Sequence, residues 1–368
     1  MSRLDELIKN LCPNGVEYKE LQQVLTIKNG SDYKKFGKGN IPVYGSGGIM
    51  TYIDHYIYDK PSVLIPRKGS IDKLYYVEEP FWNVDTIFYT NIDESKIIPK
   101  FVFYCLQMEH LEHYNTAGGV PSLTQKVLNR VVLPVPPLEV QREIVHILDH
   151  FTLLTAELTA ELTAELTARQ KQYEYYRDKL LSFDVHWGGI GELIWKTLGD
   201  VCTLQAGKAI RASEVSDIQT VEAPFPCYGA NGIRGYVKHM NQHGDSPIIG
   251  RQGALCGNVC YAIGKYYATE HAVVVSDKGY FNNRFLYHVL VNANLNQYKT
   301  AGAQPGLSVA KLENIKIPVP NKNIQNRIAH VLDNFEKICT DLSIGLPAEI
   351  AARQKQYEYY RDKLLSFQ

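Results

Sequence analysis

Two short segments of this chain carry side chains that can read the bases of DNA. Arg67-Lys68-Gly69 and Arg251-Gln252-Gly253 each place an arginine before a second polar side chain and a glycine. Arginine donates two parallel hydrogen bonds to guanine, and glutamine bonds adenine in a similar way. Base recognition is therefore the chemistry that these residues predict. A solvated turn without a partner is the alternative for each arginine.

Further basic, polar and aromatic residues lie in other predicted loops of the chain. Basic side chains contact phosphates, which position a protein on a duplex, while base contacts specify the sequence. Two tyrosines that precede glycine turns could meet DNA or could be core aromatic residues. The full set of candidate DNA-binding residues is Lys34, Lys35, Lys38, Tyr44, Ser46, Arg67, Lys68, Lys208, Arg211, Tyr228, Asn231, Arg234, Arg251 and Gln252.

The motifs of a catalytic centre are missing from the sequence. Amino-methyltransferases carry Asn/Asp-Pro-Pro-aromatic, and the segment Val135-Pro136-Pro137-Leu138 does not match that pattern. Cys227 follows a proline, as a cytosine-methyltransferase nucleophile does, but we expect a small buried residue there. Cys256 and Cys260 are too irregularly spaced from the other cysteines to predict a zinc site. We therefore expect a non-catalytic chain that itself binds no cofactor and no metal.

The elements that must position these residues occur twice along the chain. ARQKQYEYYRDKLLSF stands at 168–183 and again, unchanged, at 352–367, so the copies are offset by half of the 368 residues. The same offset relates Gln141 to Gln325, whereas Gly30 corresponds to Gly207 at a slightly shorter offset. A period of this length indicates a duplicated domain and not a solenoid repeat.

Each copy ends in a segment that predicts a long helix. From Ile144 to Leu166 apolar residues recur every three or four positions, and neither glycine nor proline interrupts 138–183. So long a helix with one apolar stripe needs a partner, and its own copy is the natural one. We expect an antiparallel pair with the globular domains at opposite ends. Gly345 and Pro347 predict a break in the second helix, with a restart at Pro347 and Glu349 in its first turn.

The first predicted helix contains a low-complexity spacer. Residues 155–166 read TAEL three times. Each unit adds about 6 Å of helix, so the spacer can act as a ruler whose length changes without a change of frame. Removing one unit should then shorten the distance between two DNA half-sites by about one base pair. The alternative is a solvated glutamate stripe over a leucine stripe.

The identical helix ends invite a second functional interpretation. Packing tolerates hydrophobic substitutions, so it does not require identity at charged and aromatic positions. Recent duplication is one explanation, and docking of an identical partner subunit by each copy is the other. The candidate docking residues are Arg169, Gln172, Tyr173, Tyr176, Arg177, Arg353, Gln356, Tyr357, Tyr360 and Arg361.

Composition adds limits on the class of protein. Lys+Arg and Asp+Glu are both 39, so the net charge is zero, whereas DNA-binding proteins usually carry a basic excess. No apolar run approaches the roughly 20 residues that span a membrane. The charged first residues do not form a signal peptide, and seven cysteines do not suggest a disulfide framework. We expect a cytoplasmic protein without membrane contact.

With these marks together, the chain resembles the DNA-specificity (S) subunit of type I restriction–modification systems. The marks are the duplication, Pro-Val-Pro-Pro-Leu at 134–138 before Gln141, the TAEL run and QKQYEYYRDKLLSF in both copies. The TAEL run and the helix ends look like the type IC branch. The resemblance implies a bipartite double-stranded DNA target, two modification subunits that bring S-adenosylmethionine, and restriction/translocation (motor) subunits that bring ATP and Mg²⁺.

The resulting expectation is an α+β chain, with mixed α/β globular domains and two long helices. Two target-recognition domains, 1–137 and 184–320, are separated by an antiparallel coiled-coil helix pair, 138–183 and 321–368. The expected function is recognition of a bipartite DNA sequence and scaffolding of the modification and motor subunits. The specificity subunit of a fused type II restriction–modification enzyme and a coiled-coil scaffold that binds no DNA remain alternatives.

Overall fold

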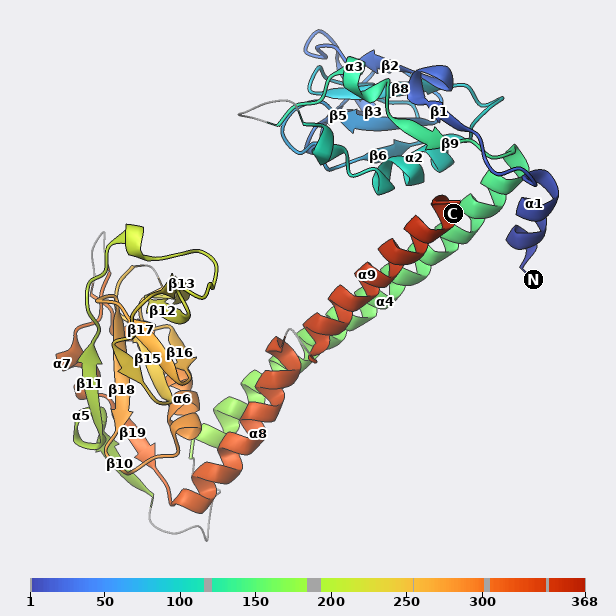
Figure 1. Ribbon diagram of the computed structural model, residues 1–368. Helices are drawn as coiled ribbons and strands as arrows, with labels where there is room; N and C mark the ends of the chain where they lie inside the picture. The colour runs from blue at the N-terminus through green and yellow to red at the C-terminus, as the bar shows by residue number, and fades with distance from the viewer. Residues whose placement is uncertain are drawn as a thin grey trace. The chain divides into compact units, whose positions relative to one another are not determined.

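The computed structural model describes residues 2–115, 121–183, 193–253, 255–300, 305–341 and 344–367. The chain forms two units, which are unit 1 (Met1–Glu161 with Ile350–Gln368) and unit 2 (Leu162–Glu349). Each unit therefore combines one recognition domain with helical segments from both copies (Figure 1). The expected start of the second domain at residue 184 lies outside the described residues.

The recognition domain of unit 1 is built on a four-stranded sheet in the order β2-β8-β5-β6 and a three-stranded sheet in the order β4-β3-β7. A third, two-stranded sheet pairs β1 with β9. Its elements are α1 (Arg3–Leu11), β1 (Tyr18–Glu20), β2 (Leu25–Asn29), β3 (Lys38–Gly45), β4 (Gly48–Ile53), β5 (Ser62–Pro66), β6 (Tyr75–Val77), β7 (Trp82–Asn83), β8 (Ile87–Ile92), α2 (Pro99–Met108), α3 (Gln125–Leu128) and β9 (Val132–Pro134). All five residues of β5 are buried, as expected for a strand in the centre of a core.

Unit 2 repeats this architecture strand for strand. Its sheets have the orders β11-β18-β15-β16, β13-β12-β17-β14 and β10-β19, so only β14 is added. Its elements are β10 (Ile194–Thr197), α5 (Leu198–Val201), β11 (Cys202–Ala206), β12 (Phe225–Gly229), β13 (Gly232–Val237), β14 (Gln242–His243), β15 (Ser246–Gly250), β16 (Val259–Ala262), β17 (Lys265–Ala268), β18 (Ala272–Asp277), α6 (Asn283–Asn292), α7 (Val309–Glu313) and β19 (Lys316–Val319). The predicted duplication and the mixed α/β class are confirmed.

Three helices extend from the two recognition domains. They are α4 (Leu138–Leu181), α8 (Lys322–Thr340) and α9 (Leu346–Leu365). The predicted long first helix and the break in the second are both confirmed. A side chain at Gly345 would lie 2.6 Å from the carbonyl oxygen of Asp341, so the break requires glycine. Leu346 restarts the helix with Glu349 in its first turn.

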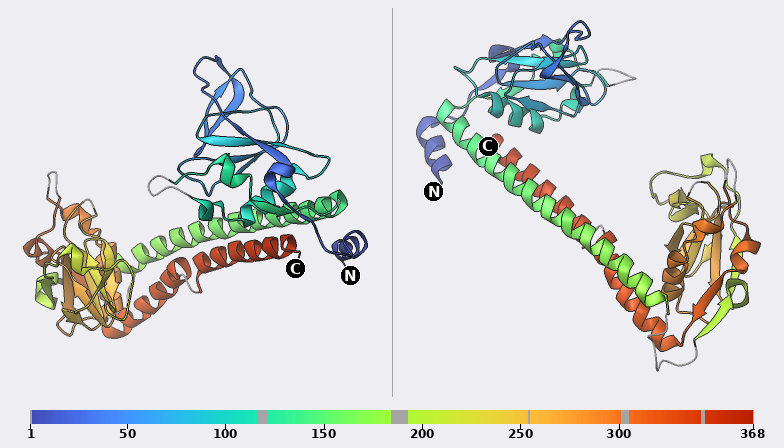
Figure 2. Two further views of the ribbon diagram at one scale, coloured as in Figure 1. Left: turned by 45° about the horizontal axis from the view of Figure 1, so that its top comes forward. Right: turned by 180° about the vertical axis from the view of Figure 1, so that it is seen from behind.

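Within each unit, α4 packs against a helix from the other copy. In unit 1 the Phe151 ring of α4 stacks on Tyr360 of α9, with ring centroids 6.1 Å apart. In unit 2 the Tyr176 ring of α4 stacks on Phe335 of α8 at 5.7 Å. The offset between the copies relates these two pairs, so the start of each copy's helix pairs with the end of the other's. Figures 1 and 2 show α9 and α8 running beside α4 in every view.

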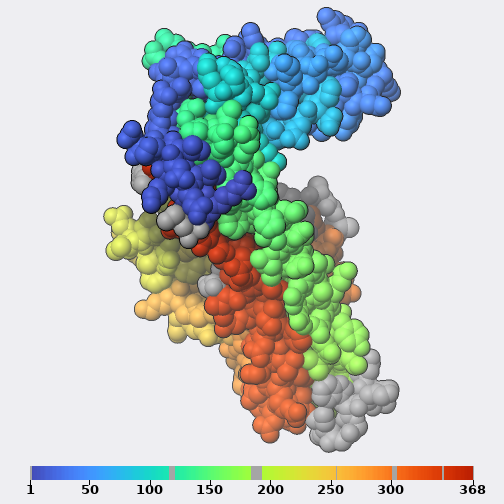
Figure 3. All heavy atoms as spheres, turned by 90° about the vertical axis from the view of Figure 1, so that its right-hand side faces the viewer, coloured from blue at the N-terminus to red at the C-terminus, as the bar shows by residue number. Residues whose placement is uncertain are grey.

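The short helix α1 covers part of the helix pair in unit 1. Leu4 of α1 is buried in the same core as Leu148 of α4 and Leu365 of α9. Arg3 adds an ion pair with Glu143 of α4 at 3.3 Å. Figure 3 shows α1, in dark blue, on the surface beside α4. Among the described residues, no helix is long and apolar enough to cross a membrane.

A buried glutamine at the start of each long helix joins it to its recognition domain. Gln141 Nε2 donates to the carbonyl oxygens of Lys96 at 3.0 Å and Pro136 at 2.7 Å, and its Oε1 accepts from the Ile98 N–H. Gln325 makes the same three bonds, to Tyr280 O, Pro320 O and Asn282 N. All three partners of Gln325 follow those of Gln141 at the same offset as the two glutamines. Both junctions are therefore built by identical bonds.

Candidate nucleic-acid interface

In unit 1, three loops meet beside the turn of the β3–β4 hairpin. The N–H of Arg67, after β5, donates to the Thr86 carbonyl oxygen at 2.8 Å, and Leu123 N–H donates to the Arg67 carbonyl oxygen at 2.9 Å. Ser46, in the hairpin turn, donates its N–H to Thr86 Oγ1 at 3.4 Å. The structure thus brings Ser46, Arg67 and Lys68 together. We call the group Ser46, Arg67, Lys68, Asp85 and Thr86 the unit 1 tip.

The arginine of the unit 1 tip is held against the core. Its guanidinium carbon lies 5.8 Å from the centre of the Phe88 ring, and Phe88 is buried in β8. Arg67 is half-buried, whereas Lys68 beside it is exposed. Gly69 adopts a positive φ of 81°, which turns the chain after this pair. The arginine is thus partly ordered before any ligand binds.

Unit 2 forms the same arrangement with other side chains. Arg251 N–H donates to the His271 carbonyl oxygen at 2.9 Å, and Leu307 N–H donates to the Arg251 carbonyl oxygen at 2.9 Å. A side chain at Gly250 would clash with the Ala230 carbonyl oxygen, so the β12–β13 turn lies against this loop. We call the group Asn231, Arg251, Gln252, Glu270 and His271 the unit 2 tip.

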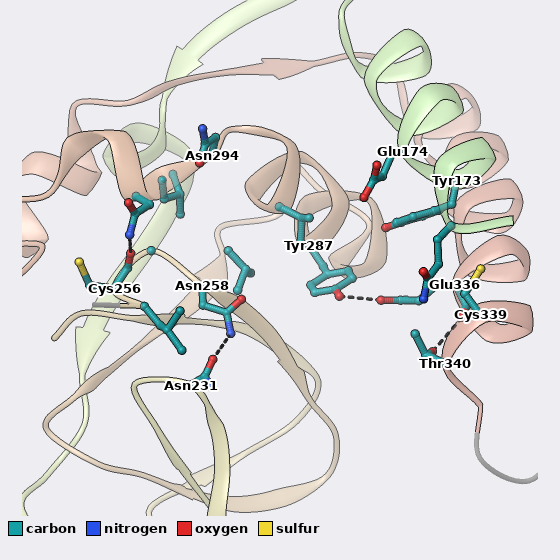
Figure 4. Close-up of a pocket in the computed structure, with 17 residues that line it drawn as sticks. Tyr173, Glu174, Asn231, Cys256, Asn258, Tyr287, Asn294, Glu336, Cys339 and Thr340 are labelled. Atoms are coloured by element: carbon teal, nitrogen blue, oxygen red, sulfur yellow. Dashed lines mark hydrogen bonds between the residues drawn. The ribbon is translucent and has the colours of Figure 1, made fainter. Parts of the chain in front are cut away.

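Two further candidate residues, Asn231 and Arg234, lie in the β12–β13 hairpin, and Arg234 takes the place that Met50 has over Gly45 in unit 1. Asn258 Nδ2 donates to Asn231 Oδ1 at 2.7 Å, which ties the hairpin turn to the loop before β16 (Figure 4). Arg234 extends along β13 over Gly229 and is exposed. Sequence reasoning chose Arg234 and Asn231 but passed over Asp85, Glu270 and His271. The sequence feature that could have identified Asp85 and Glu270 is that an acidic residue recurs at equivalent places in the two copies.

The remaining basic candidates lie away from the tips. Lys34 and Lys35 precede β3, and Lys38 begins it, at the end of the strand opposite Gly45. All three lysines are exposed, and Lys35 Nζ lies 5.0 Å over the Phe36 ring. The structure therefore separates these lysines from Ser46 and Arg67. They form a second surface at the other end of the hairpin, where Asp32 and Asp54 lie beside them.

A basic pocket occupies the corresponding end of the hairpin in unit 2. It has a volume of about 700 Å³, and Arg211, Lys238 and His239 line it together with Glu214 and Tyr267. Lys208 lies in the same loop as Arg211, where its N–H donates to the Ala268 carbonyl oxygen at 3.0 Å. Sequence reasoning did not include Lys238 and His239 in the candidate set, although the sequence shows two adjacent basic residues there.

The two candidate tyrosines differ in exposure. Tyr228 is 7% exposed and packs edge-on against the Tyr266 ring at 5.6 Å, so it is a core residue of unit 2. Its side chain has no free face for a base, which favours the core interpretation. Tyr44 is half-buried, with its ring 5.9 Å from that of Tyr75, whose hydroxyl donates to the Ser46 carbonyl oxygen.

The helix ends carry the candidate docking residues in two environments. The candidates Tyr176 on α4 and Tyr360 on α9 are exposed. Beside them lie the still more exposed Tyr175 and Tyr359, which sequence reasoning did not choose. Arg361, by contrast, is 7% exposed and pairs with Asp362 at 2.7 Å. The other candidates engage neighbours as follows: Arg169 with Glu165 and Gln172, Arg177 with Asp178 and Tyr173, Arg353 with Gln356, and Tyr357 with Thr152.

Beside Tyr173, unit 2 gathers a network of charged and polar side chains. His288 Nε2 lies 2.7 Å from Asp333 Oδ1, and Arg284 bonds both Asp333 and Glu336. Burial, followed by the charge of Glu336, raises the pKa of Tyr173 to about 12, so this phenol stays neutral. His288, Asp333 and Glu336 could hold a metal ion by proximity, but Arg284 already supplies the positive charge that the two carboxylates require.

A cleft of about 940 Å³ separates this network from the loops below the unit 2 tip. Figure 4 shows Tyr173 and Glu336 on its helical side, and Asn231 and Asn258 on its recognition side. Its walls are mostly amides, apolar groups and carboxylates. This chemistry does not favour a phosphate, so we assign DNA contact to the tips and basic surfaces.

Comparison with known proteins identifies the repeated part of the chain. The family model described as "Type I restriction modification DNA specificity domain" matches residues 13–168 and again residues 194–352. The type I restriction enzyme EcoprrI specificity subunit of Escherichia coli is 44% identical over 253 residues, 66% of this chain and 62% of that protein. The match thus spans less than two thirds of that relative.

A second relative matches along almost its whole length. The putative type I restriction enzyme specificity subunit S.HindORF215P of Haemophilus influenzae is 32% identical over 98% of both chains. None of the proteins named here is described as a fused type II enzyme or as a scaffold that binds no DNA.

Solved structures show the same fold at low sequence identity. A chain from a structure of complex assembly in the type I restriction–modification system superposes with a TM-score of 0.68, at 15% identity over 96% of this chain and 98% of that one. The S subunit from M. genitalium gives a TM-score of 0.53 at 18% identity, over 96% and 97% of the two chains.

Proposed function

The chain belongs to the family of type I restriction–modification DNA specificity subunits, and we propose that each tip reads one part of a bipartite double-stranded DNA target. It is a non-catalytic recognition subunit, as its family membership shows. One observation carries the assignment of the tips. The same backbone bonds hold Arg67 and Arg251, while the neighbouring side chains differ. Two equal frameworks with unlike side chains suit two unlike half-sites.

Phosphate contacts belong to the basic surfaces at the other ends of the hairpins. Arg211 and Lys238 share one pocket wall in unit 2, and Lys34, Lys35 and Lys38 are exposed in unit 1. Such contacts fix position and orientation and carry no sequence information. This division explains how a chain without net positive charge can bind DNA, because the positive charge is concentrated locally.

Partners complete the assembly in this proposal. Each identical helix end presents two exposed tyrosines, so two copies of a modification subunit can dock on equivalent surfaces. Those subunits carry S-adenosylmethionine, and restriction/motor subunits carry ATP and Mg²⁺, so the specificity chain needs no cofactor. The complex acts on DNA in the cytoplasm. Partner subunits can also supply much of the basic channel around the duplex, so the chain alone should bind DNA weakly.

Arginine variants test the tips. In the complex with modification subunits, Arg67→Ala and Arg251→Ala should each weaken specific binding about 5- to 150-fold, the value of one bidentate base contact. Methylome mapping should show relaxed preference in one half-site for each variant. Arg130→Ala and Arg327→Ala, at exposed positions of the two units, are the controls. Unchanged affinity and sequence preference in both tip variants would refute the assignment.

Salt dependence tests the basic pocket separately. Arg211→Ala and Lys238→Ala should each reduce the slope of log K against log salt by about 1 and leave the preferred sequence unchanged. A changed base preference in either variant would move that residue from the phosphate class to the base-reading class.

Docking is tested by stoichiometry. Tyr175→Ala and Tyr359→Ala change side chains that are 58% and 62% exposed, on equivalent surfaces of α4 and α9. Mass photometry of the reconstituted complex should show one bound modification subunit for each single variant and none for the double variant. Tyr56→Ala, a change at a similarly exposed tyrosine in unit 1, is the control. Full occupancy of both sites in the double variant would exclude these tyrosines as docking residues.

A further inference from the structure

Each tip contains an acidic residue one position before the residue that accepts the N–H of its arginine. Asp85 immediately precedes Thr86, whose carbonyl oxygen accepts from the N–H of Arg67. Glu270 immediately precedes His271, whose carbonyl oxygen accepts from the N–H of Arg251. The two carboxylates therefore occupy equivalent positions, next in the chain to the bond that anchors each arginine. The duplicated backbone explains why both units have a carboxylate at this position. The two side chains differ in length because one is an aspartate and the other a glutamate.

In unit 2, this position contains polar atoms that lack partners. Glu270 Oε1 lies 3.2 Å from His271 Nε2. The other oxygen of Glu270, Nδ1 of His271 and Nε of Arg251 are shielded from solvent and have no hydrogen-bond partner. A shielded polar atom without a partner is unfavourable until a ligand supplies one. The Glu270 and His271 side chains are 39% and 37% exposed, so both residues remain accessible to a ligand.

At the same position in unit 1, the loop is already hydrogen-bonded to the hairpin turn, and the Asp85 carboxylate is exposed. Thr86 Oγ1 accepts the Ser46 N–H, so the hairpin turn and the loop are already bonded. Asp85 is exposed beside them. Both tips carry an arginine. The contrast is that the unit 1 tip adds one open carboxylate, whereas the unit 2 tip adds a carboxylate that lies beside an imidazole.

A carboxylate on a DNA-facing surface has a specific chemical consequence. It is repelled by phosphates, and it can only accept hydrogen bonds, so a base edge without a donor leaves it unpaired. In the major groove the available donors are the exocyclic amino groups of cytosine and adenine. An arginine alone selects for acceptors, and an added carboxylate selects for a neighbouring donor and penalises sequences that lack one.

We propose that Asp85 and Glu270 are specificity-determining residues, each accepting a hydrogen bond from the exocyclic amino group of a base in the half-site that its own unit reads. The inference rests on the proposed function and deepens it. It assigns a base contact to each carboxylate, next to the base that Arg67 or Arg251 reads. Phosphate contacts and docking do not involve these residues.

The experiment replaces each carboxylate by its amide in the full complex with modification subunits. Asp85→Asn and Glu270→Gln keep side-chain size and let the group both donate and accept. Methylome mapping should show that discrimination at one base position falls about tenfold in the half-site of the changed unit only. The base found at that position in the wild-type target shows whether the carboxylate accepts from the amino group of cytosine or from that of adenine.

Controls and contrary results are matched to the same units. Asp59→Asn in unit 1 and Glu313→Gln in unit 2 remove exposed carboxylates away from the tips. If the wild-type complex modifies one bipartite sequence and both tip variants keep the preference of these controls, the inference is wrong and the proposed function stands. A second variant, Glu270→Ala, guards against an amide that restores the contact by flipping, and it should relax the same position. A wild-type complex without sequence preference would overturn the inference and the proposed function together.

Discussion

The two units are most alike where they meet their helices and least alike at their tips. Gln141 and Gln325 make the same three hydrogen bonds to backbone groups at equivalent places in the two copies. At the tips, the backbone bonds are again the same, but Thr86 corresponds to His271 and Lys68 to Gln252. The comparison shows that the duplicated chain keeps the bonds that position each loop and varies the side chains that the loops present.

An intermediate case lies on the helix-facing side of each recognition domain. In unit 1, Tyr104 and Lys100 bond Asp149 at 2.6 and 2.9 Å. In unit 2, His288 and Arg284 bond Asp333 at the equivalent positions. The carboxylate is retained and its donors are exchanged, which preserves the junction with different side chains.

Shortening the spacer changes the distance between the two recognition domains without changing either domain. We expect this change to have the largest effect. Deletion of one TAEL unit, for example 159–162, removes about 6 Å of α4 and leaves both tips unchanged. We expect modification at the original target to be lost and a new target to appear with the same half-sites, about one to two base pairs closer together.

Methylome mapping of the spacer deletion gives the result directly. Substitution of the same residues by four alanines, which preserves length, is the matched control. An unchanged spacing in the deletion variant would refute the ruler interpretation and leave a solvated glutamate stripe.

Removing a junction glutamine tests whether the two frameworks are energetically equal. Gln141→Leu or Gln325→Leu leaves two carbonyl oxygens and one N–H without a buried partner, at a cost of about 3–6 kcal/mol. Because the bonds are the same, the two losses should agree within about 1 kcal/mol. Urea unfolding followed by hydrogen exchange assigns each loss to its unit, with the exposed Gln354→Leu as control. Losses below about 1 kcal/mol would show that these bonds do not hold the junction.

Acid should weaken the Asp333 junction of unit 2. Burial raises the pKa of Asp333, but hydrogen bonds from His288 and Arg284 and their charges outweigh it and hold the pKa below its usual range. A lowered pKa stabilises the folded state above the unfolded value of about 4, and this contribution disappears as pH falls through the folded value.

The expected result is a modest loss of unit 2 stability below about pH 4 that Asp333→Asn does not show. The variant should instead be less stable than the wild type at pH 7. Thermal unfolding between pH 3 and pH 7 makes the measurement. An identical acid response in both proteins would mean that Asp333 contributes nothing to the pH dependence.

The sequence was most informative where the backbone needs a particular residue. Gly30 and Gly207 were paired at a shorter offset, and a side chain at either would lie within 2.3 Å of a carbonyl oxygen. The helix break was predictable because Gly345 and Pro347 disfavour a continuous helix. These positions are constrained by local sterics, which residue type reveals.

The sites were less predictable, because they depend on which distant loops meet. Tyr44 and Tyr228 occupy equivalent positions before a glycine turn, yet only Tyr228 is fully buried. Glu270 and His271 were not among the residues predicted to read bases. Their place beside Arg251 depends on a bond between two loops that β16 and β17 separate in the chain, which no local pattern records.

The exchange of helix ends between copies has a consequence for how the chain is made on the ribosome. Leu365 is fully buried in the core of unit 1, together with Leu4 and Leu148. At about 5–20 residues per second, synthesis of the chain between unit 1's two segments takes on the order of ten to forty seconds. During that interval the apolar face of α4 near Leu148 awaits the last helix. Unit 2, whose segments are contiguous, can close first although it is made second.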